Sequence, residues 1–182
     1  MEWLASPIDP TRPHDVSLFV SWHARLMVLA WAFLFPTGIL AARYFKILPW
    51  QKWPQQLDSR VWWRTHLTCQ YVGGVAVFAG LIFVIMAPDA LGGDLWHAIM
   101  GWSAIAVCGL QFTSGWLRGT KGGPTHLGRD GSLSGDHYDM SLRRIAFEYY
   151  HKTVGYLGLS CAWAAILFGL WQANAPIWMW VS

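Results

Sequence analysis

Four long apolar stretches constrain this chain more than any other feature of its sequence. They run over about 16–42, 61–87, 95–117 and 145–171. About 20 helical residues cross a hydrocarbon layer about 30 Å thick, so each stretch is long enough to span a bilayer. Charged residues make up only 13% of the chain, against about 25% in soluble domains. We therefore predict an all-α integral membrane protein built as a four-helix bundle.

The rest of the chain divides around these spans. Residues 1–15 are polar, contain prolines and lack the pattern of a signal peptide. We expect them to form a non-cytoplasmic segment. Residues 16–172 form the predicted transmembrane domain, with one long glycine-rich loop at 118–144. Residues 173–182 are too short for a fifth span, and we expect them to lie along the membrane interface as a tail.

The basic residues predict how the bundle is oriented. Of the thirteen Lys and Arg residues, only Arg12 and Arg25 fall on the side of the two termini. Since cytoplasmic loops carry the excess of Lys and Arg, both termini are predicted to face away from the cytoplasm. We expect a multi-pass protein of a bacterial inner membrane, embedded in lipid, with no nucleic-acid partner.

Histidines recur near the start of every span, as His23, His66, His97 and His151. Because successive helices run in opposite directions, His23 and His97 share one membrane edge, and His66 and His151 share the other. Two imidazoles leave zinc short of its usual four ligands, whereas haem needs only axial ligands. A single intramembrane histidine usually serves as a hydrogen-bonding residue, but four at matched depths favour two haem b groups. The predicted outer pair is His23/His97, and the predicted inner pair is His66/His151.

Small residues beside these histidines support the same interpretation. Gly101 follows His97 by four residues, and Gly155 follows His151 by four. Each therefore lies one helical turn along the same face, where a flat macrocycle needs room. Gly73 and Gly74 follow His66 by seven and eight residues, although close packing between helices would explain such glycines equally well.

Basic residues gather around the predicted inner haem. Some are expected to pair with haem propionates, and others are topology determinants in contact with lipid phosphates. The residues predicted to contact the cofactor are Arg43, Arg64 and Lys152. The residues predicted to form a substrate or partner site are Lys46, Arg60, Arg143 and Arg144. The loop 118–144 holds His126, Asp136, His137 and Asp139 in a spacing that matches no metal motif, which favours a lid or a docking surface.

The starts of the four spans resemble a known family. They read WHARLMVLAW, WWRTHLTCQ, LWHAIMGW and FEYYHKTVGY, and the segments AARYFK, GTKGGPT and GDHYDM add to the likeness. Together they resemble the cytochrome b561 family, in the branch joined to DOMON domains or found as single-domain bacterial proteins. The resemblance covers residues 18–171. It implies two b haems on the histidine pairs given above.

Two classes of function remain open from the sequence. The first is transmembrane electron transfer, with a quinol, an ascorbate-like compound or another small reductant on the cytoplasmic side and a separate redox protein on the outer side. The second is a quinol-linked cytochrome b subunit or a haem-containing membrane anchor of a larger redox complex. Both allow a homodimer. Arg60 and Arg64 stand where ascorbate-dependent relatives commonly have lysines, so ascorbate itself is weakly supported.

Overall fold

Four long helical segments dominate the computed structural model, which describes residues 2–52, 59–87, 93–118, 126–134 and 142–181. The helices long and apolar enough to cross a membrane are Leu18–Tyr44, Val61–Ile85, Leu95–Leu117 and Leu142–Gln172. The last three are α4, α5 and α6. These bounds confirm the predicted spans to within three residues at each end. The α6 helix begins earlier than predicted and so includes Arg143 and Arg144.

The first span consists of three consecutive pieces with no break between them. These are α2 (Leu18–Val28), a π-helical segment η1 (Leu29–Leu34) and α3 (Phe35–Tyr44). Pro36 lies in the first turn of α3 and has no N–H to donate to the turn before it. The preceding turn is widened, and the N–H of Phe35 donates to the carbonyl of Ala30, five residues back. The widened turn carries Ala30 and Trp31, both of which are buried.

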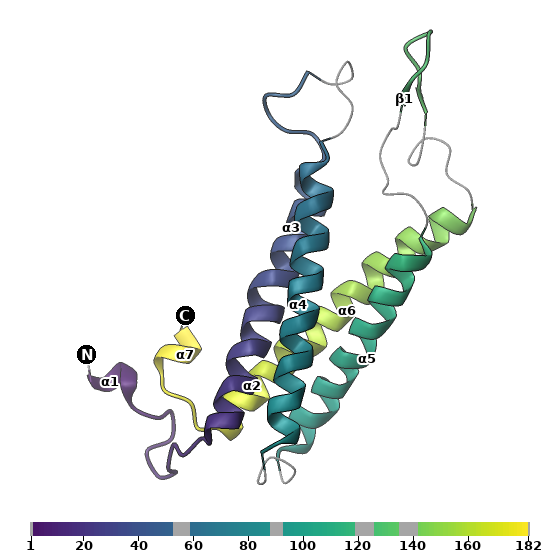
Figure 1. The fold of residues 1–182 in the computed structure, drawn as a ribbon. Helices are drawn as coiled ribbons and strands as arrows, with labels where there is room; N and C mark the ends of the chain where they lie inside the picture. Colours follow the sequence, from purple (N-terminus) through teal and green to yellow (C-terminus); the bar gives the residue numbers. More distant parts are fainter. Residues whose placement is uncertain (1, 53–58, 88–92, 119–125, 135–141, 182) are drawn as a thin grey trace.

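The helices are arranged as two hairpins. In one hairpin α2, η1 and α3 pack along α4, and in the other α5 packs along α6. Figure 1 shows the two pairs diverging towards the end of the bundle that carries the short antiparallel pairing of β1 (His126–Leu127) and β2 (Leu133–Ser134). Contacts between the hairpins run chiefly from α6 to α2 and η1. The hairpins are therefore in closest contact away from that end of the bundle.

The core of the bundle is built from small residues and a few large rings. Trp31 and Phe35 meet edge to face at 4.7 Å between ring centroids, among alanines that include Ala76, Ala104 and Ala162. Large apolar side chains such as Phe33, Val75 and Phe78 point outward instead and are largely exposed. A soluble protein would bury such side chains, so the outward faces suit lipid.

The N-terminal and C-terminal segments are hydrogen-bonded to each other beside α2 (Figure 1). The Ile8 N–H donates to the carbonyl of Ala175, and the Ile177 N–H donates to the carbonyl of Ser6. Asn174 is 2% exposed, accepts from the Asp9 N–H and donates to the carbonyls of Asp9 and Arg12. We call residues 6–14 and 171–177 the terminal clasp. No sequence pattern predicted the terminal clasp. The short helices α1 (Glu2–Ala5) and α7 (Trp178–Val181) flank it.

Candidate functional site

The structure brings the four predicted histidines together in two pairs. The ring centroids of His23 and His97 lie 6.2 Å apart, and their planes meet at 78°. The ring centroids of His66 and His151 lie 6.5 Å apart, and their planes meet at 68°. Each pair joins one helix of the first hairpin to one helix of the second. These are the pairings predicted from the alternating directions of the spans.

Each imidazole is held by a hydrogen bond at Nδ1. His23 and His66 pair with the carbonyls of Gly80 and Gly38 at 2.9 and 3.0 Å, while His97 pairs with the carbonyl of Ala165 at 2.8 Å. A carbonyl only accepts, so in these three rings Nδ1 carries the proton and Nε2 presents its lone pair. This is the arrangement that orients a metal-bound histidine and raises its basicity.

His151 reaches the same state through a hydroxyl. Its Nδ1 lies 3.1 Å from the Ser114 Oγ, and that hydroxyl donates its own proton to the carbonyl of Gln111 at 3.0 Å. The Ser114 oxygen is therefore left to accept from Nδ1–H, and Nε2 of His151 is again unprotonated. Ser114 was not singled out in the sequence. A hydroxyl inside an apolar span, at the depth of a histidine on the next helix, is the signal that points to it.

The partner of every Nδ1 belongs to the same hairpin as its histidine. The Gly80 and Gly38 carbonyls lie on α4 and α3, whereas Ala165 and Ser114 lie on α6 and α5. The hydrogen bonds thus aim each ring from within its own hairpin towards the ring on the other. Asp94 adds to this for His97, because its carboxylate caps α5 and accepts from the backbone N–H of His97.

The spacing of the paired rings fits a six-coordinate iron. A metal–imidazole nitrogen bond of about 2 Å on each side, with about 1 Å from each nitrogen to its ring centre, separates two axial rings by about 6 Å. Both observed separations agree with this value. In the part of the chain that the structure describes, no cluster of three or more His, Cys, Asp or Glu side chains suits a metal ion. A pair of imidazoles with a macrocycle is therefore the arrangement that the donor atoms favour.

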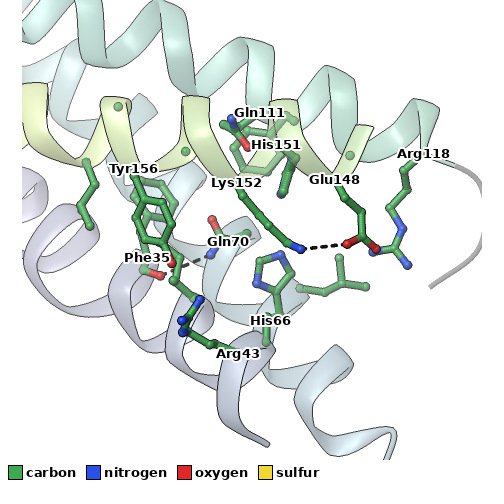
Figure 2. Close-up of a pocket in the computed structure, with 18 of the residues that line it drawn as sticks. Phe35, Arg43, His66, Gln70, Gln111, Arg118, Glu148, His151, Lys152 and Tyr156 are labelled. Carbon is green, nitrogen blue, oxygen red and sulfur yellow. Dashed lines mark hydrogen bonds and ion pairs between the residues drawn. The ribbon is translucent and has the colours of Figure 1, made fainter. Parts of the chain in front are cut away.

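A cavity of about 700 Å³ lies between the hairpins at the His66 and His151 end. Figure 2 shows the two imidazoles facing it from opposite helices. Aromatic rings line it, together with the amides of Gln70 and Gln111. The Gln111 Nε2 is buried and has no hydrogen-bond partner among the residues that the structure describes. The volume falls in the range of pockets that hold large organic ligands.

The predicted glycines divide between two roles. A Cβ on Gly101 would meet nothing within 4 Å, and Gly155 lies on the cavity wall. A Cβ on Gly73 would come within 2.5 Å of the Phe35 ring, and one on Gly74 within 2.8 Å of the Phe112 ring. Gly73 and Gly74 thus serve close packing against aromatic rings, which was the alternative left open from the sequence.

The predicted basic residues also divide. Arg43, Lys46, Arg144 and Lys152 line the cavity. Arg60, Arg64 and Arg143 are exposed and are not among its lining residues, and Arg143 donates to the carbonyl of Leu117 instead. For these three the structure does not place the side chain where a cofactor or substrate role was predicted. The helical phase of the first turns of α4 and α6 turns them outward.

Two charged residues of the cavity were not predicted as site residues. They are Arg118, directly after α5, and Glu148 on α6. Glu148 accepts from Lys152 Nζ at 2.8 Å (Figure 2). It also pairs with Arg144 Nη2 at 3.3 Å. A carboxylate in the first turns of a spanning helix, four residues from a base on each side, is a recognisable signal in the sequence. Of the proposed loop residues, Asp136, His137 and Asp139 lie outside the described residues.

The fold and these sites define a class: a multi-pass membrane protein with paired histidines near both ends of a four-helix bundle. Residues 22–121 match the family model described as Eukaryotic cytochrome b561. The chain therefore belongs to the cytochrome b561 family, whose members carry out haem-dependent transmembrane electron transfer. This confirms the family and the multi-pass membrane character predicted from the sequence.

One curated relative is the "Cytochrome b561, DM13 and DOMON domain-containing protein" of Arabidopsis thaliana. It is 28% identical over 156 residues, which are 86% of this chain and 15% of the relative. The chain thus spans a small part of that protein's length. Because the relative is eukaryotic, it gives no support to the predicted bacterial inner membrane. No solved structure gives a significant match.

Proposed function

We propose that this chain binds two b-type haems, one on His23 and His97 and one on His66 and His151, and that electrons pass through them across the membrane. The observation that carries the proposal is the state of the four rings. Each is held at Nδ1, and each pair is spaced for one iron between two Nε2 atoms. Bound haem supplies the one-electron chemistry of its iron.

The protein contributes ligands, orientation and exclusion of other reactions. Two imidazoles per iron fill both axial positions, so a substrate has no coordination position to occupy. The hydrogen bonds at Nδ1 fix which ring nitrogen carries the proton and hold the planes of the rings. The apolar core between the two pairs, built around Trp31 and Phe35, keeps water out of the middle of the bundle. These features suit transfer of electrons rather than activation of a bound substrate.

The charge of the cavity and the domains of the relative suggest the electron donor and the electron partner. The cavity at the His66 and His151 end opens among basic side chains, which favours a small anionic or quinol-type reductant at that end. The distribution of Lys and Arg makes this the cytoplasmic end. The relative carries DM13 and DOMON domains beside its cytochrome part. By analogy, we propose a separate redox protein or domain as the electron partner at the other end.

The test is a His97→Ala variant of the purified protein, with His14→Ala as the matched control. His14 lies in the terminal clasp, where its Nδ1 contacts the carbonyl of Ala173, outside the spans. We expect His97→Ala to bind one haem instead of two, to lose one of two b-type signals in reduced-minus-oxidised spectra, and to stop electron transfer across proteoliposomes. His14→Ala should retain all three properties. Two haems and full transfer in His97→Ala would show the proposal to be wrong.

A further inference from the structure

Each of the two inner imidazoles stacks on an aromatic ring that also contacts a guanidinium. Behind His66 lies Trp63, with ring centroids 6.4 Å apart and planes 23° apart. The guanidinium carbon of Arg118 lies over the Trp63 ring, 4.1 Å from its centroid. Arg118, Trp63 and His66 thus form a series of contacts that ends at one imidazole of the inner pair.

His151 has an equivalent arrangement on the opposite hairpin. Phe147 stacks on it at 5.0 Å between centroids, with planes 29° apart. The Arg144 guanidinium carbon lies 5.5 Å from the Phe147 centroid, and Arg144 is only 8% exposed. We call the Arg118–Trp63–His66 and Arg144–Phe147–His151 sets the arginine stacks. The two sets end at the two imidazoles of the inner pair, whose centroids lie 6.5 Å apart.

The charged residues around the His66 and His151 site are mostly positive. Its described lining includes the bases Arg43, Lys46, Arg118, Arg144 and Lys152 and the single acid Glu148. At the outer pair the comparable guanidinium, Arg25, lies over Trp22, and Trp22 stacks on Phe83 rather than on a ligand ring. The two sites therefore differ in the charge placed behind their ligands, although their ligand geometry is alike.

This difference acts on the redox equilibrium of a metal between the inner rings. An oxidised iron carries one more positive charge than a reduced one, so a fixed cation nearby favours the reduced state. The effect is larger where lipid and packed side chains replace water. Hydrogen bonds, charge and burial around axial ligands are among the means by which proteins set such potentials.

We propose that Arg118 and Arg144 are positioning residues that act through Trp63 and Phe147 and raise the reduction potential of the haem between His66 and His151. Glu148 opposes Arg144 and lowers that potential. This inference rests on the proposed binding of two haems. It deepens that proposal, because it assigns to the arginine stacks the difference between two sites with similar ligands.

The experiment is a potentiometric titration of the haem absorption bands in the complete, haem-loaded protein. We expect Arg118→Gln and Arg144→Gln each to lower the potential of one haem component and to leave the other unchanged. Arg118→Lys keeps the positive charge, so the potential of this variant should lie close to that of the unmodified protein. Arg143→Gln is the matched control, because Arg143 neighbours Arg144 but is exposed and bonded to the Leu117 carbonyl. It should shift neither component.

The Glu148→Gln variant tests the predicted direction of the shift in potential. Removing this carboxylate should raise the potential of the same component, which is the opposite of the change expected for the arginine variants. A general loosening of the site would instead shift the potential in the same direction in all three variants. If Arg144→Gln does not fold, the Arg118 and Glu148 variants decide alone. Two bound haems with unshifted potentials, or shifts of one sign in all variants, would overturn the inference. Failure of the unmodified protein to bind two haems would instead overturn the proposed function.

Discussion

At the scale of single residues, the atom that each Nδ1 meets decides what the imidazoles can do. Three of the partners are backbone carbonyls of Gly38, Gly80 and Ala165, which are small residues. Small residues allow the neighbouring helix to come close enough for its carbonyl to be reached. Gly169 serves His97 in a related way, since a Cβ there would lie 3.1 Å from the His97 ring. The orientation of these imidazole rings therefore depends on residues whose side chains have no reactive group.

Gly101→Leu should separate haem binding from helix packing. The added side chain enters open space one turn from His97, so we expect less than about 0.5 kcal/mol of change in the haem-free protein. In the presence of haem the same atoms occupy the room proposed for the macrocycle, and the haem content should fall from two towards one. Gly109→Leu is the control, because Gly109 also lacks neighbours within 4 Å but is exposed on the bundle surface. Equal haem content in both variants would contradict the assignment.

The terminal clasp gives a prediction for pH. The Thr11 hydroxyl, the Thr11 N–H and then Arg12 hold the pKa of the Asp9 carboxyl below its ordinary value of 3.8. A depressed pKa means that this contribution to the clasp is present above about pH 4 and is lost as the pH falls through the folded-state pKa. Thr11→Val removes the largest cause and should raise the pKa of Asp9 towards its ordinary value. Carboxyl-carbon NMR of labelled aspartate measures both values, and Ser132→Ala in the β1–β2 turn should leave Asp9 unchanged.

The histidines and their pairing were predictable, but their surroundings were not. Pairing follows from the alternating direction of the spans, which hydropathy reveals. The carbonyls at Gly38 and Gly80 could not be predicted, because every residue has a carbonyl and only the register of the packed helices selects one. Arg64 and Arg118 show the same limit. The sequence places both near the inner site, but the helical phase turns only Arg118 towards it.

At the scale of elements, the first span shows how a helix can serve two sites. The widened η1 turn separates the part that carries His23 from the part that carries Gly38, whose carbonyl holds His66. Hydropathy predicted one continuous span and did not indicate the widened turn before Pro36. The π-helical turn depends on how the preceding carbonyls are satisfied, which composition does not encode.

Gly38→Leu tests the close approach of α3 and α4. A Cβ there would lie 2.6 Å from Gln70 Nε2 and 3.1 Å from the Cys69 Cβ, so the helices must move apart. We expect a cost of about 1–3 kcal/mol, as for other overpacked positions. The spectrum should lose the component of the inner haem, since the carbonyl that holds His66 moves away. Thr37→Leu, on the exposed neighbour, should bind two haems. Retention of both components in Gly38→Leu would show that this hydrogen bond is dispensable.

At the scale of the whole molecule, the bundle is two hairpins with dense contacts within each and few between them. The histidine pairs bridge the hairpins at both ends. Haem that binds only the paired state would stabilise it by about 4 kcal/mol at a thousandfold excess over its Kd. We therefore expect the haem-free protein to unfold at a lower temperature than the loaded one. It should also show faster amide exchange along the surface between the hairpins, measured by mass spectrometry.

The same measurement has an internal control in the terminal clasp. The hydrogen bonds of Asn174 link segments that lie outside the bundle, so haem loading should leave amide exchange at residues 6–14 unchanged. Uniform protection of the whole chain on loading would argue against a bridge between preformed hairpins. It would indicate instead that the bundle folds as one unit around its cofactor.

The location of each Nδ1 partner within its own hairpin has a geometric consequence. Both hairpins begin at the same surface of the bilayer, and each carries one of the paired imidazoles near either surface, together with the group that orients it. Rotating one hairpin by half a turn about the membrane normal would place its ligands roughly where the other has its own. A homodimer of a single symmetric two-helix peptide should therefore suffice to assemble both coordination sites. The chain departs from this symmetry at Ser114. Its hydroxyl contacts His151 Nδ1, whereas exact symmetry would require a backbone carbonyl there.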